Sequence, residues 1–345
     1  MKIINNKVLS QMLKELKKAP PIYQPSNFWV DLNRIHLNQL INADIDNFKR
    51  SVNMRYFNWG VLGIIRHQLP VVLSQINKGN FDPILKSKFV YSFSESEEQV
   101  KRFNWLSALI YKVFVSSFAD YISQNDYLNL LDSLEEPLVG NPFVVEYKNK
   151  LISQDLCNSI HEFYAIRQSG KFPKKMKIAE LGAGYGRLAF IFLKVLPDSS
   201  YCIIDIPPAL YISQKYLSTV FPGEKIFKFK PFKSYQQIKK EFESARIQFL
   251  MPHQIELLPK KQFGLFITVS SLHEMRRDQI RNYLKHINRL TKGYFYTKQW
   301  QQSHTVDNQN IKEHQYPVPG KWKAVLKNSP HPIQRMFFDA LYKIP

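Results

Sequence analysis

The sequence predicts an α/β protein built on a mostly parallel, doubly wound sheet. Residues 177–188, reading KIAELGAGYGRL, place a short apolar strand, three glycines and the start of a helix in direct succession. Strand and helix patterns then alternate to the end of the chain, and Asp205 closes the second strand 19 residues after Gly186. In this class of fold, ligands bind at the edge where parallel strands end and helices begin.

Bulk composition is that of a globular protein. The 345 residues are 44% hydrophobic and 14% aromatic, which excludes a disordered chain. Its two cysteines, Cys157 and Cys202, make no disulfide framework. The first residues lack the apolar core of a secretion signal, and no run approaches the roughly 18 apolar residues of a membrane-spanning helix. We therefore expect a cytoplasmic protein.

The formal net charge of +20 favours an anionic partner. Three kinds of anionic partner would be attracted to this charge: a phosphorylated or nucleotide-linked small molecule, a nucleic acid, or an anionic surface. Because the lysines and arginines are scattered and form no long basic tail, the pattern disfavours a nucleic acid. We expect a small-molecule or glycan acceptor.

Composition also indicates where a domain ends. Residues 1–140 show helical patterns without a catalytic motif, and residues 135–142, reading EEPLVGNP, are typical of a turn-rich link. We place the boundary there, between a helical N-terminal domain of residues 1–140 and a sheet domain of residues 141–345. The helical domain is expected to act as an acceptor lid or in dimerisation, so a homodimer is a candidate state.

Seven strands are predicted in the second domain. The pattern places helices at 187–193 and 277–290, and it places the last strand antiparallel to its neighbours. The expected strands are residues 178–181, 201–204, 247–251, 265–269, 294–297, 322–326 and 336–343.

The glycine turn has the form E-x-G-x-G-x-G. A dinucleotide fingerprint would need a third glycine where Arg187 stands. Glu180 would repel a phosphate but not a sulfonium or an ammonium group. The pattern resembles the first motif of class I S-adenosylmethionine-dependent methyltransferases, which have a Rossmann-like sheet. This resemblance implies that S-adenosylmethionine is held by Glu180, Gly182, Ala183, Gly184, Tyr185 and Gly186.

Residues at the ends of the next strands complete the expected cofactor site. Asp205 is placed to accept hydrogen bonds from ribose hydroxyls, and Ile206 follows it under the adenosine. His253 and Gln254 come after the third strand and are expected over the adenine. Ser270 follows the fourth strand at the same edge.

His273 is the candidate catalytic base, because it lies just past the fourth strand and a histidine can accept a proton near neutral pH. Glu274 beside it could orient the imidazole, bind a substrate hydroxyl or join a metal site. The structural alternative is a helix N-terminal turn in which His273 and Glu274 act as caps. No metal site is predicted, because the sequence lacks a cysteine cluster and convincing ligand spacing.

Several strings together resemble the sugar O-methyltransferase family of bacteria. The resemblance implies methylation of a sugar hydroxyl in glycan or surface-polysaccharide biosynthesis. In addition, LHEM falls where small-molecule O-methyltransferases similar to those of plants carry a catalytic histidine, which supports His273. One departure is Gly264, where such enzymes often have aspartate. The strings are VGNP, NSIHEFY, ELGAGYGRLA, DIPPALYISQKYL, SSLHEM and YFYTKQW, beginning at residues 139, 158, 180, 205, 270 and 294.

Two other functions stay open at this point. An RNA methyltransferase is favoured by the net charge, but the chain has no N-P-P-Y string after the fourth strand and no appended RNA-binding motif. The second alternative is a catalytically silent scaffold, which would have the same sheet and bind the cofactor but would lack a catalytic base.

Overall fold

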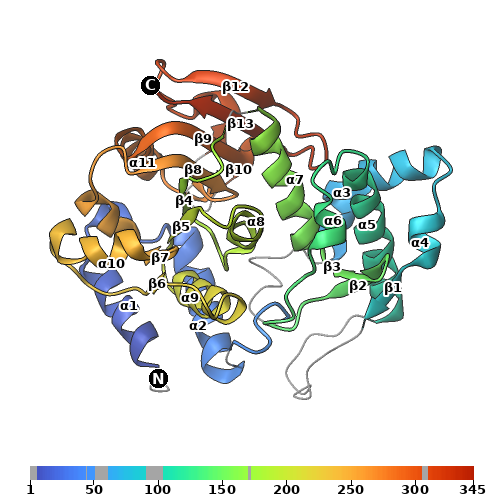
Figure 1. The fold of residues 1–345 in the computed structure, drawn as a ribbon, viewed down its shortest axis with the longest axis horizontal. Helices are drawn as coiled ribbons and strands as arrows, with labels where there is room; N and C mark the ends of the chain where they lie inside the picture. The colour runs from blue at the N-terminus through green and yellow to red at the C-terminus, as the bar shows by residue number, and fades with distance from the viewer. Residues whose placement is uncertain (1–5, 44, 51–60, 91–103, 170–171, 305–309) are drawn as a thin grey trace. The chain divides into compact units, whose positions relative to one another are not determined.

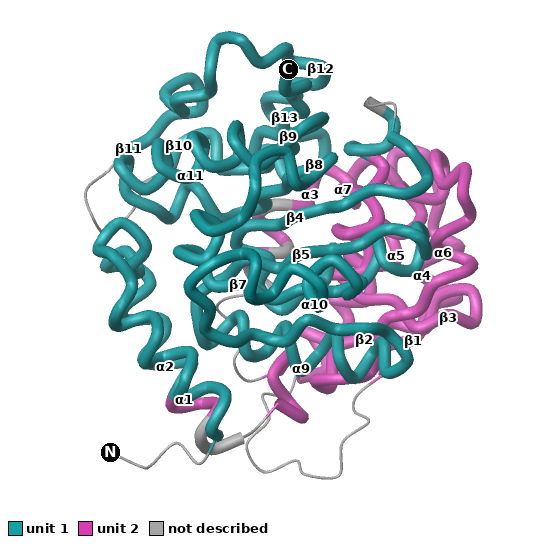
Figure 2. The backbone as a smooth tube through the Cα atoms, turned by 60° about the vertical axis from the view of Figure 1, so that its left-hand side comes forward, with its two compact units in different colours: residues 1–37, 165–345 teal, residues 38–164 magenta. Residues whose placement is uncertain are grey.

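Two compact units make up the chain. The computed structural model describes residues 6–43, 45–50, 61–90, 104–169, 172–304 and 310–345. Unit 1 comprises residues 1–37 and 165–345, and unit 2 comprises residues 38–164 (Figure 2). This division differs from the boundary predicted after residue 140, because the first helix and the residues after it pack with the sheet.

Unit 1 carries the large sheet (Figure 1). Its helical elements are α1 (Lys7–Lys18), η1 (Pro21–Tyr23), the first part of α2 (Asn27–Ala43), the end of α7 (Gln154–Ser169), α8 (Arg187–Val195), α9 (Ala209–Val220), η3 (Tyr235–Gln237), α10 (Lys239–Ser244), η4 (Pro252–Leu257), η5 (Leu272–Glu274), α11 (Arg277–Leu290) and η6 (Glu313–Gln315). Its strands are β4 (Lys177–Leu181), β5 (Ser200–Ile204), β6 (Ile226–Phe227), β7 (Ile247–Leu250), β8 (Phe263–Val269), β9 (Thr291–Trp300), β10 (Gln302–His304), β11 (Asn310–Lys312), β12 (Lys323–Asn328) and β13 (Phe337–Lys343).

The strand order of the large sheet is β12-β13-β9-β8-β4-β5-β7-β6. The strands from β9 to β6 are mutually parallel, whereas β13 is antiparallel to both β9 and β12. The predicted mostly parallel sheet, with its last strand inserted antiparallel, is confirmed. The predicted count of seven is wrong, because the two-residue strand β6 adds an eighth strand at the edge beside β7.

Burial explains why β4 and β5 lie in the middle of the sheet. Four residues of each strand are buried in succession, as expected for parallel strands covered on both faces. Side chains of α8 and α9 pack on one face, where Phe192 contacts Tyr201. The other face joins α10, α11 and η1 in one apolar cluster that includes Phe242, Leu284 and Tyr23.

The N-terminal segment belongs to unit 1 through specific contacts. Leu9, Met12 and Leu16 are buried along one face of α1, as the amphipathic spacing of this helix indicates. Gln279 of α11 donates hydrogen bonds through Nε2 to the carbonyl oxygens of Ile22 and Gln24, at 3.1 and 2.7 Å. These two bonds join residues 22–24 to the start of α11.

Unit 2 combines helices with a small antiparallel sheet of order β1-β2-β3. Residues before 140 are therefore not wholly helical, since β1 lies among them. Within the described part of the chain, no helix has both the length and the apolar character needed to cross a membrane. The elements are the end of α2, α3 (Val61–Asn77), α4 (Asp82–Lys86), β1 (Lys88–Val90), α5 (Trp105–Ser123), α6 (Leu130–Ser133), β2 (Val144–Tyr147), β3 (Lys150–Ile152) and most of α7.

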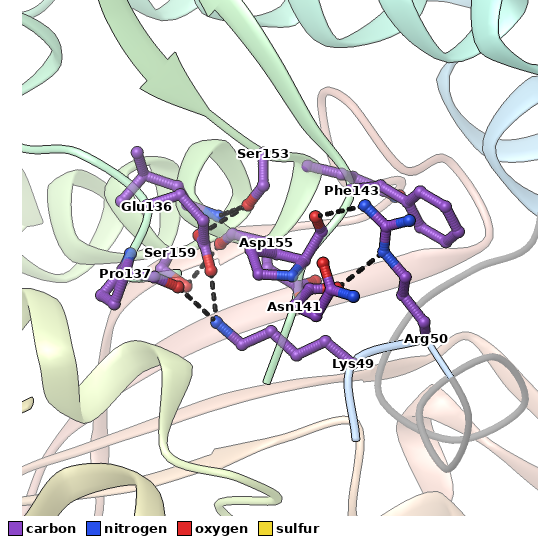
Figure 3. Close-up of polar contacts among 12 residues, drawn as sticks. Lys49, Arg50, Glu136, Pro137, Asn141, Phe143, Ser153, Asp155 and Ser159 are labelled. Carbon is purple, nitrogen blue, oxygen red and sulfur yellow. Dashed lines mark hydrogen bonds and ion pairs between the residues drawn. The ribbon is translucent and has the colours of Figure 1, made fainter. Parts of the chain in front are cut away.

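A buried ion pair ties unit 2 together. Lys49 and Glu136 are 2.5 Å apart, and their side chains are only 1% and 4% exposed. Glu136 also accepts a hydrogen bond from the Ser153 hydroxyl at 2.7 Å, and Lys49 donates one to the Pro137 carbonyl (Figure 3). Both charges therefore have polar partners, which a buried charge requires.

The stretch around VGNP is part of this core rather than an exposed link. Arg50 is buried, donates hydrogen bonds to the Asn141 and Pro142 carbonyls at 2.8 and 3.2 Å, and stacks on the Phe143 ring (Figure 3). Gly140 has a φ of +84°, and a Cβ there would lie 2.3 Å from the Phe48 ring. Compact packing explains this glycine, so the turn-rich composition did not mark a linker.

Replacing Lys49 with methionine should lower the free energy of unfolding by about 3–5 kcal/mol, because Glu136 would stay buried without its cation. The matched control is Lys86→Met in the exposed Lys86–Asp82 pair, where about 0–1 kcal/mol is expected. Urea unfolding of both variants measures the difference. Equal losses would show that the buried pair contributes no more than the surface pair.

Candidate active site

The glycine turn joins β4 to α8 and lies against the end of β8. Gly182 has a φ of +72°, and a Cβ at this position would lie 2.1 Å from Ser271 Oγ. Gly186 has a φ of +90°, and its Cβ would meet Leu217 of α9 at 2.9 Å. Any larger residue would therefore meet both backbone strain and a steric clash. Neighbouring side chains therefore explain the glycines at both positions.

Asp205 binds the glycine turn directly. Its Oδ2 accepts a hydrogen bond from the Gly184 amide at 2.9 Å, and its Oδ1 accepts one from the Ile206 amide at 2.7 Å. Burial raises the pKa of Asp205 to about 7, although both hydrogen bonds act to lower it. The structure thus brings together three of the predicted cofactor residues at one edge of the sheet.

The other residues of the turn face different surroundings. Glu180 is buried, and its Oε2 accepts a hydrogen bond from the Tyr201 hydroxyl at 2.7 Å. Tyr185 is 2% exposed and packs edge-to-face on Tyr216 of α9, with ring centroids 5.1 Å apart. Ala183 is also buried. The side chain of Tyr185 therefore packs against α9 and does not point out from the edge of the sheet where a ligand would bind.

The two residues predicted over the adenine have different environments. The Gln254 amide is engaged by backbone groups: Oε1 accepts from Met251 N at 2.9 Å, and Nε2 donates to Lys230 O at 2.9 Å. His253 is half-buried, and burial lowers its pKa while Glu15 of α1 and Glu256 of η4 oppose that shift. Contact of either side chain with an adenine stays a prediction.

Gln299 of β9 organises the end of β8, and the sequence analysis missed it. Its Oε1 accepts hydrogen bonds from the backbone amides of Ser271 and His273, at 3.1 and 3.2 Å. Its Nε2 donates to the Thr268 carbonyl at 3.2 Å. Ser270 is exposed, with a φ of +51°. A glutamine inside an apolar strand, as in YFYTKQW, was the available signal, because a buried amide needs partners.

His273 lies in the interior rather than at the surface. It is fully buried and stacks on the Trp300 ring, with centroids 4.3 Å apart. Its Nδ1 is 3.0 Å from Gln299 Oε1, and its Nε2 is 3.6 Å from Glu274 Oε1. Burial lowers its pKa to about 3, although the contact with Gln299 opposes this shift.

Glu274 is the more accessible member of the pair, with a side chain that is 17% exposed. Burial and the charge of Asp205 raise its pKa well above the ordinary value, and a hydrogen bond from the Trp29 side chain opposes the shift. The Ser26 hydroxyl donates to the Glu274 carbonyl at 2.9 Å. The N-terminal segment thus reaches the predicted catalytic residues. Among the described residues, no group of three or more His, Cys, Asp or Glu side chains could hold a metal ion.

Comparisons with known proteins find likeness at the level of structure. No protein-family model matches this chain, and no curated protein matches it. The chain is similar to a SAM dependent methyltransferase from Aquifex aeolicus, with 10% identity, a TM-score of 0.36, and coverage of 53% of this chain and 89% of that one. It is similar to a glycopeptide N-methyltransferase, with 14% identity, a TM-score of 0.38, and coverage of 56% and 91%.

A third solved structure is magnesium protoporphyrin IX methyltransferase from Synechocystis PCC 6803, crystallised with bound SAM. The identity is 10%, the TM-score is 0.39, and the coverage is 56% of this chain and 83% of that one. At these scores the fold assignment rests on the strand order and pairing described above.

Replacing Gly182 with alanine should lower the free energy of unfolding by about 1–3 kcal/mol through strain at its positive φ, and by more through the clash with Ser271. Because Ser271→Gly removes the clashing atoms, the double variant should lose at least about 0.5 kcal/mol less than the sum of the two single variants. Gly223→Ala is the control, since a Cβ there meets nothing within 4 Å. Denaturant unfolding of the wild type and the four variants gives these losses, and strict additivity would contradict the predicted contact.

The raised pKa of Asp205 predicts a pH dependence of stability. The folded protein holds this proton up to pH about 7, whereas an unfolded aspartate has a pKa of 3.8. The contribution is therefore fully present below pH 3.8 and is lost as the pH rises to about 7. It amounts to at most about 4 kcal/mol, at about 1.4 kcal/mol per pKa unit.

The Asp205→Asn variant should lack this component, and the exposed Asp198→Asn is its control. Denaturant unfolding at pH 4.5 and 7.5 gives the change in stability for each protein. The expectation fails when Asp205→Asn and the wild type lose the same stability between the two pH values.

Proposed function

We propose that this protein is an S-adenosylmethionine-dependent methyltransferase that acts on a hydroxyl of a sugar or glycoconjugate. The observation that carries the proposal is the junction of the glycine turn with Asp205, whose carboxylate accepts the Gly184 amide at the end of the adjacent strand. A carboxylate offers about four acceptor sites, and backbone amides occupy two of them. Asp205 can therefore accept ribose hydroxyls as well, so its donor set fits a nucleoside.

Charge distinguishes this ligand from a dinucleotide. Glu180 and Asp205 place two carboxyl groups at the turn, and neither favours a pyrophosphate near it. The strand order also differs from the classic dinucleotide fold, which has no antiparallel strand inserted beside its fifth strand. A cationic sulfonium with an adenosine fits this edge better than a dinucleotide does.

The reaction requires an electrophilic methyl group, which the cofactor supplies when bound, and a positioned acceptor. Gly182, Gly184 and Asp205 would hold the adenosine part. The carboxyl group of Glu274 lies near enough to Asp205 for their charges to interact, so it can meet an acceptor beside the cofactor. The Glu274 carboxylate, as a group that can accept the hydroxyl proton, supports methyl transfer to oxygen. The resemblance of the sequence to sugar O-methyltransferases supports a sugar as the acceptor.

The net charge of +20 bears on the acceptor. It supports a phosphorylated or nucleotide-linked sugar, and it keeps an RNA acceptor as the second candidate. Tight binding of mixed RNA that weakens steeply with added salt would favour RNA, because phosphate contacts release counterions. A cytoplasmic location and a homodimer formed through the helical region also stay proposals.

Calorimetric titration with S-adenosylhomocysteine tests the cofactor assignment. The wild type should bind with a micromolar dissociation constant, and Asp205→Ala should bind at least about tenfold more weakly, a loss of about 1.4 kcal/mol. Asp198→Ala, which changes an exposed aspartate of the same unit, should bind like the wild type. No binding to the wild type would remove the cofactor and the proposed reaction together.

A further inference from the structure

The orientation of the Gln299 amide is fixed at both ends by backbone groups. Its Oε1 lies 3.1 and 3.2 Å from the Ser271 and His273 amides, which can only donate. Its Nε2 lies 3.2 Å from the Thr268 carbonyl oxygen, which can only accept. Exchanging the oxygen and nitrogen would break all three bonds, so the assignment does not depend on the ambiguity common to glutamine amides.

This orientation bears on the tautomer of His273. The Nδ1 atom lies 3.0 Å from Gln299 Oε1, an acceptor, and this contact favours a hydrogen on Nδ1. The Trp300 amide donates a hydrogen bond to Nδ1 at 3.4 Å, which only the other tautomer would accept, and this contact is the longer of the two. We give the shorter contact precedence. With Nδ1 protonated, the neutral ring has its lone pair on Nε2.

The lone pair of Nε2 faces Glu274. Within the described residues this buried nitrogen has no hydrogen-bond partner, and the nearest carboxyl oxygen, Glu274 Oε1, is 3.6 Å away. A buried acceptor beside a carboxyl group stabilises the protonated acid, which can donate to it. Meanwhile His273 is fully buried, so its ring has no surface on which an acceptor could bind.

We propose that Glu274 is the group that faces the acceptor, and that His273, locked by Gln299 as the Nδ1–H tautomer, is a positioning residue behind it. This assignment reverses the roles expected from the sequence and rests on the proposed function. A hydroxyl acceptor that becomes methylated loses its proton: the O–H bond breaks, a carboxyl O–H bond forms on Glu274, and the oxygen keeps the electron pair that bonds the methyl carbon. The methyl carbon would come from the sulfonium of the bound cofactor, whose sulfur would keep the electron pair of the broken C–S bond and leave as the neutral thioether. The new carboxyl proton then points to His273 Nε2.

The groups around Glu274 set the pH at which it accepts a proton. Asp205 at the end of β5 and Tyr316 after η6 interact electrostatically with Glu274, and Trp29 of α2 donates a hydrogen bond to it. His273 lies on its own element. Burial and the Asp205 charge both favour the protonated acid, so ionisation of Glu274 occurs above the ordinary range of a carboxyl group.

Nitrogen NMR of the ¹⁵N-histidine-labelled protein tests this arrangement without any acceptor. His273→Gln identifies the resonances of this ring, and spectra are recorded from pH 5 to 9. We expect a neutral ring protonated at Nδ1 throughout, with a single Nε2 shift change as Glu274 ionises. In Glu274→Gln, the Nδ1–H tautomer should persist while the shift change disappears.

Three results would overturn the proposal: an Nε2–H tautomer, protonation of the ring between pH 5 and 8, or an Nε2 shift change that survives in Glu274→Gln. All are visible with the wild type and the two variants His273→Gln and Glu274→Gln, so the test does not depend on the folding of a Gln299 substitution. Titration of the same samples with S-adenosylhomocysteine separates the two proposals. Binding with the wrong tautomer overturns only the roles of His273 and Glu274. The expected tautomer without binding overturns the proposed function and with it the acceptor role of Glu274, and only the tautomer of His273 is then left standing.

Discussion

The buried amide of Gln299 is the interaction on which the candidate site depends. It is fully buried, and its oxygen and nitrogen bond the residues that leave β8 as well as the Thr297 hydroxyl on its own strand. A buried polar group whose partners are all satisfied fixes one geometry, because any shift would leave a donor or acceptor unpaired. Gln299 therefore determines where Ser271 and His273 lie.

The position of Ser271 in turn shapes the glycine turn. Its hydroxyl occupies the space that a side chain at Gly182 would need, and the turn continues to Gly184, whose amide binds Asp205. The ends of four neighbouring strands are thus joined through backbone amides and small side chains. Such a network holds the strand ends in one geometry and places no large side chain at this edge. A ligand that approaches the backbone closely would need both properties.

Local patterns predicted much of this fold, but long-range polar contacts did not follow from them. The helix predicted at 277–290 is α11 to the residue, since its apolar spacing reports burial against one face. The sequence also predicted that Asp205 and the glycine turn lie at the same edge, because parallel strands that are neighbours end at one edge of the sheet. The partners that Gln299 finds outside its own strand lie 26 to 31 residues away, and the carbonyls to which Gln279 donates lie 257 and 255 residues away. No periodicity encodes such pairs, so the N-terminal segment was assigned to the wrong unit.

Two carboxyl groups, the buried Asp205 and the half-buried Glu274, respond together to a charge placed at this edge. Burial raises the pKa of both Asp205 and Glu274, and the charge of Asp205 further raises that of Glu274. A cation placed near them would favour both ionised forms, whereas an anion would favour both protonated forms and gain no attraction from them. The same low-dielectric surroundings that make an isolated carboxylate costly would strengthen its attraction to a sulfonium. The edge is therefore better matched to a cationic nucleoside than to a phosphate, for a reason independent of any sequence motif.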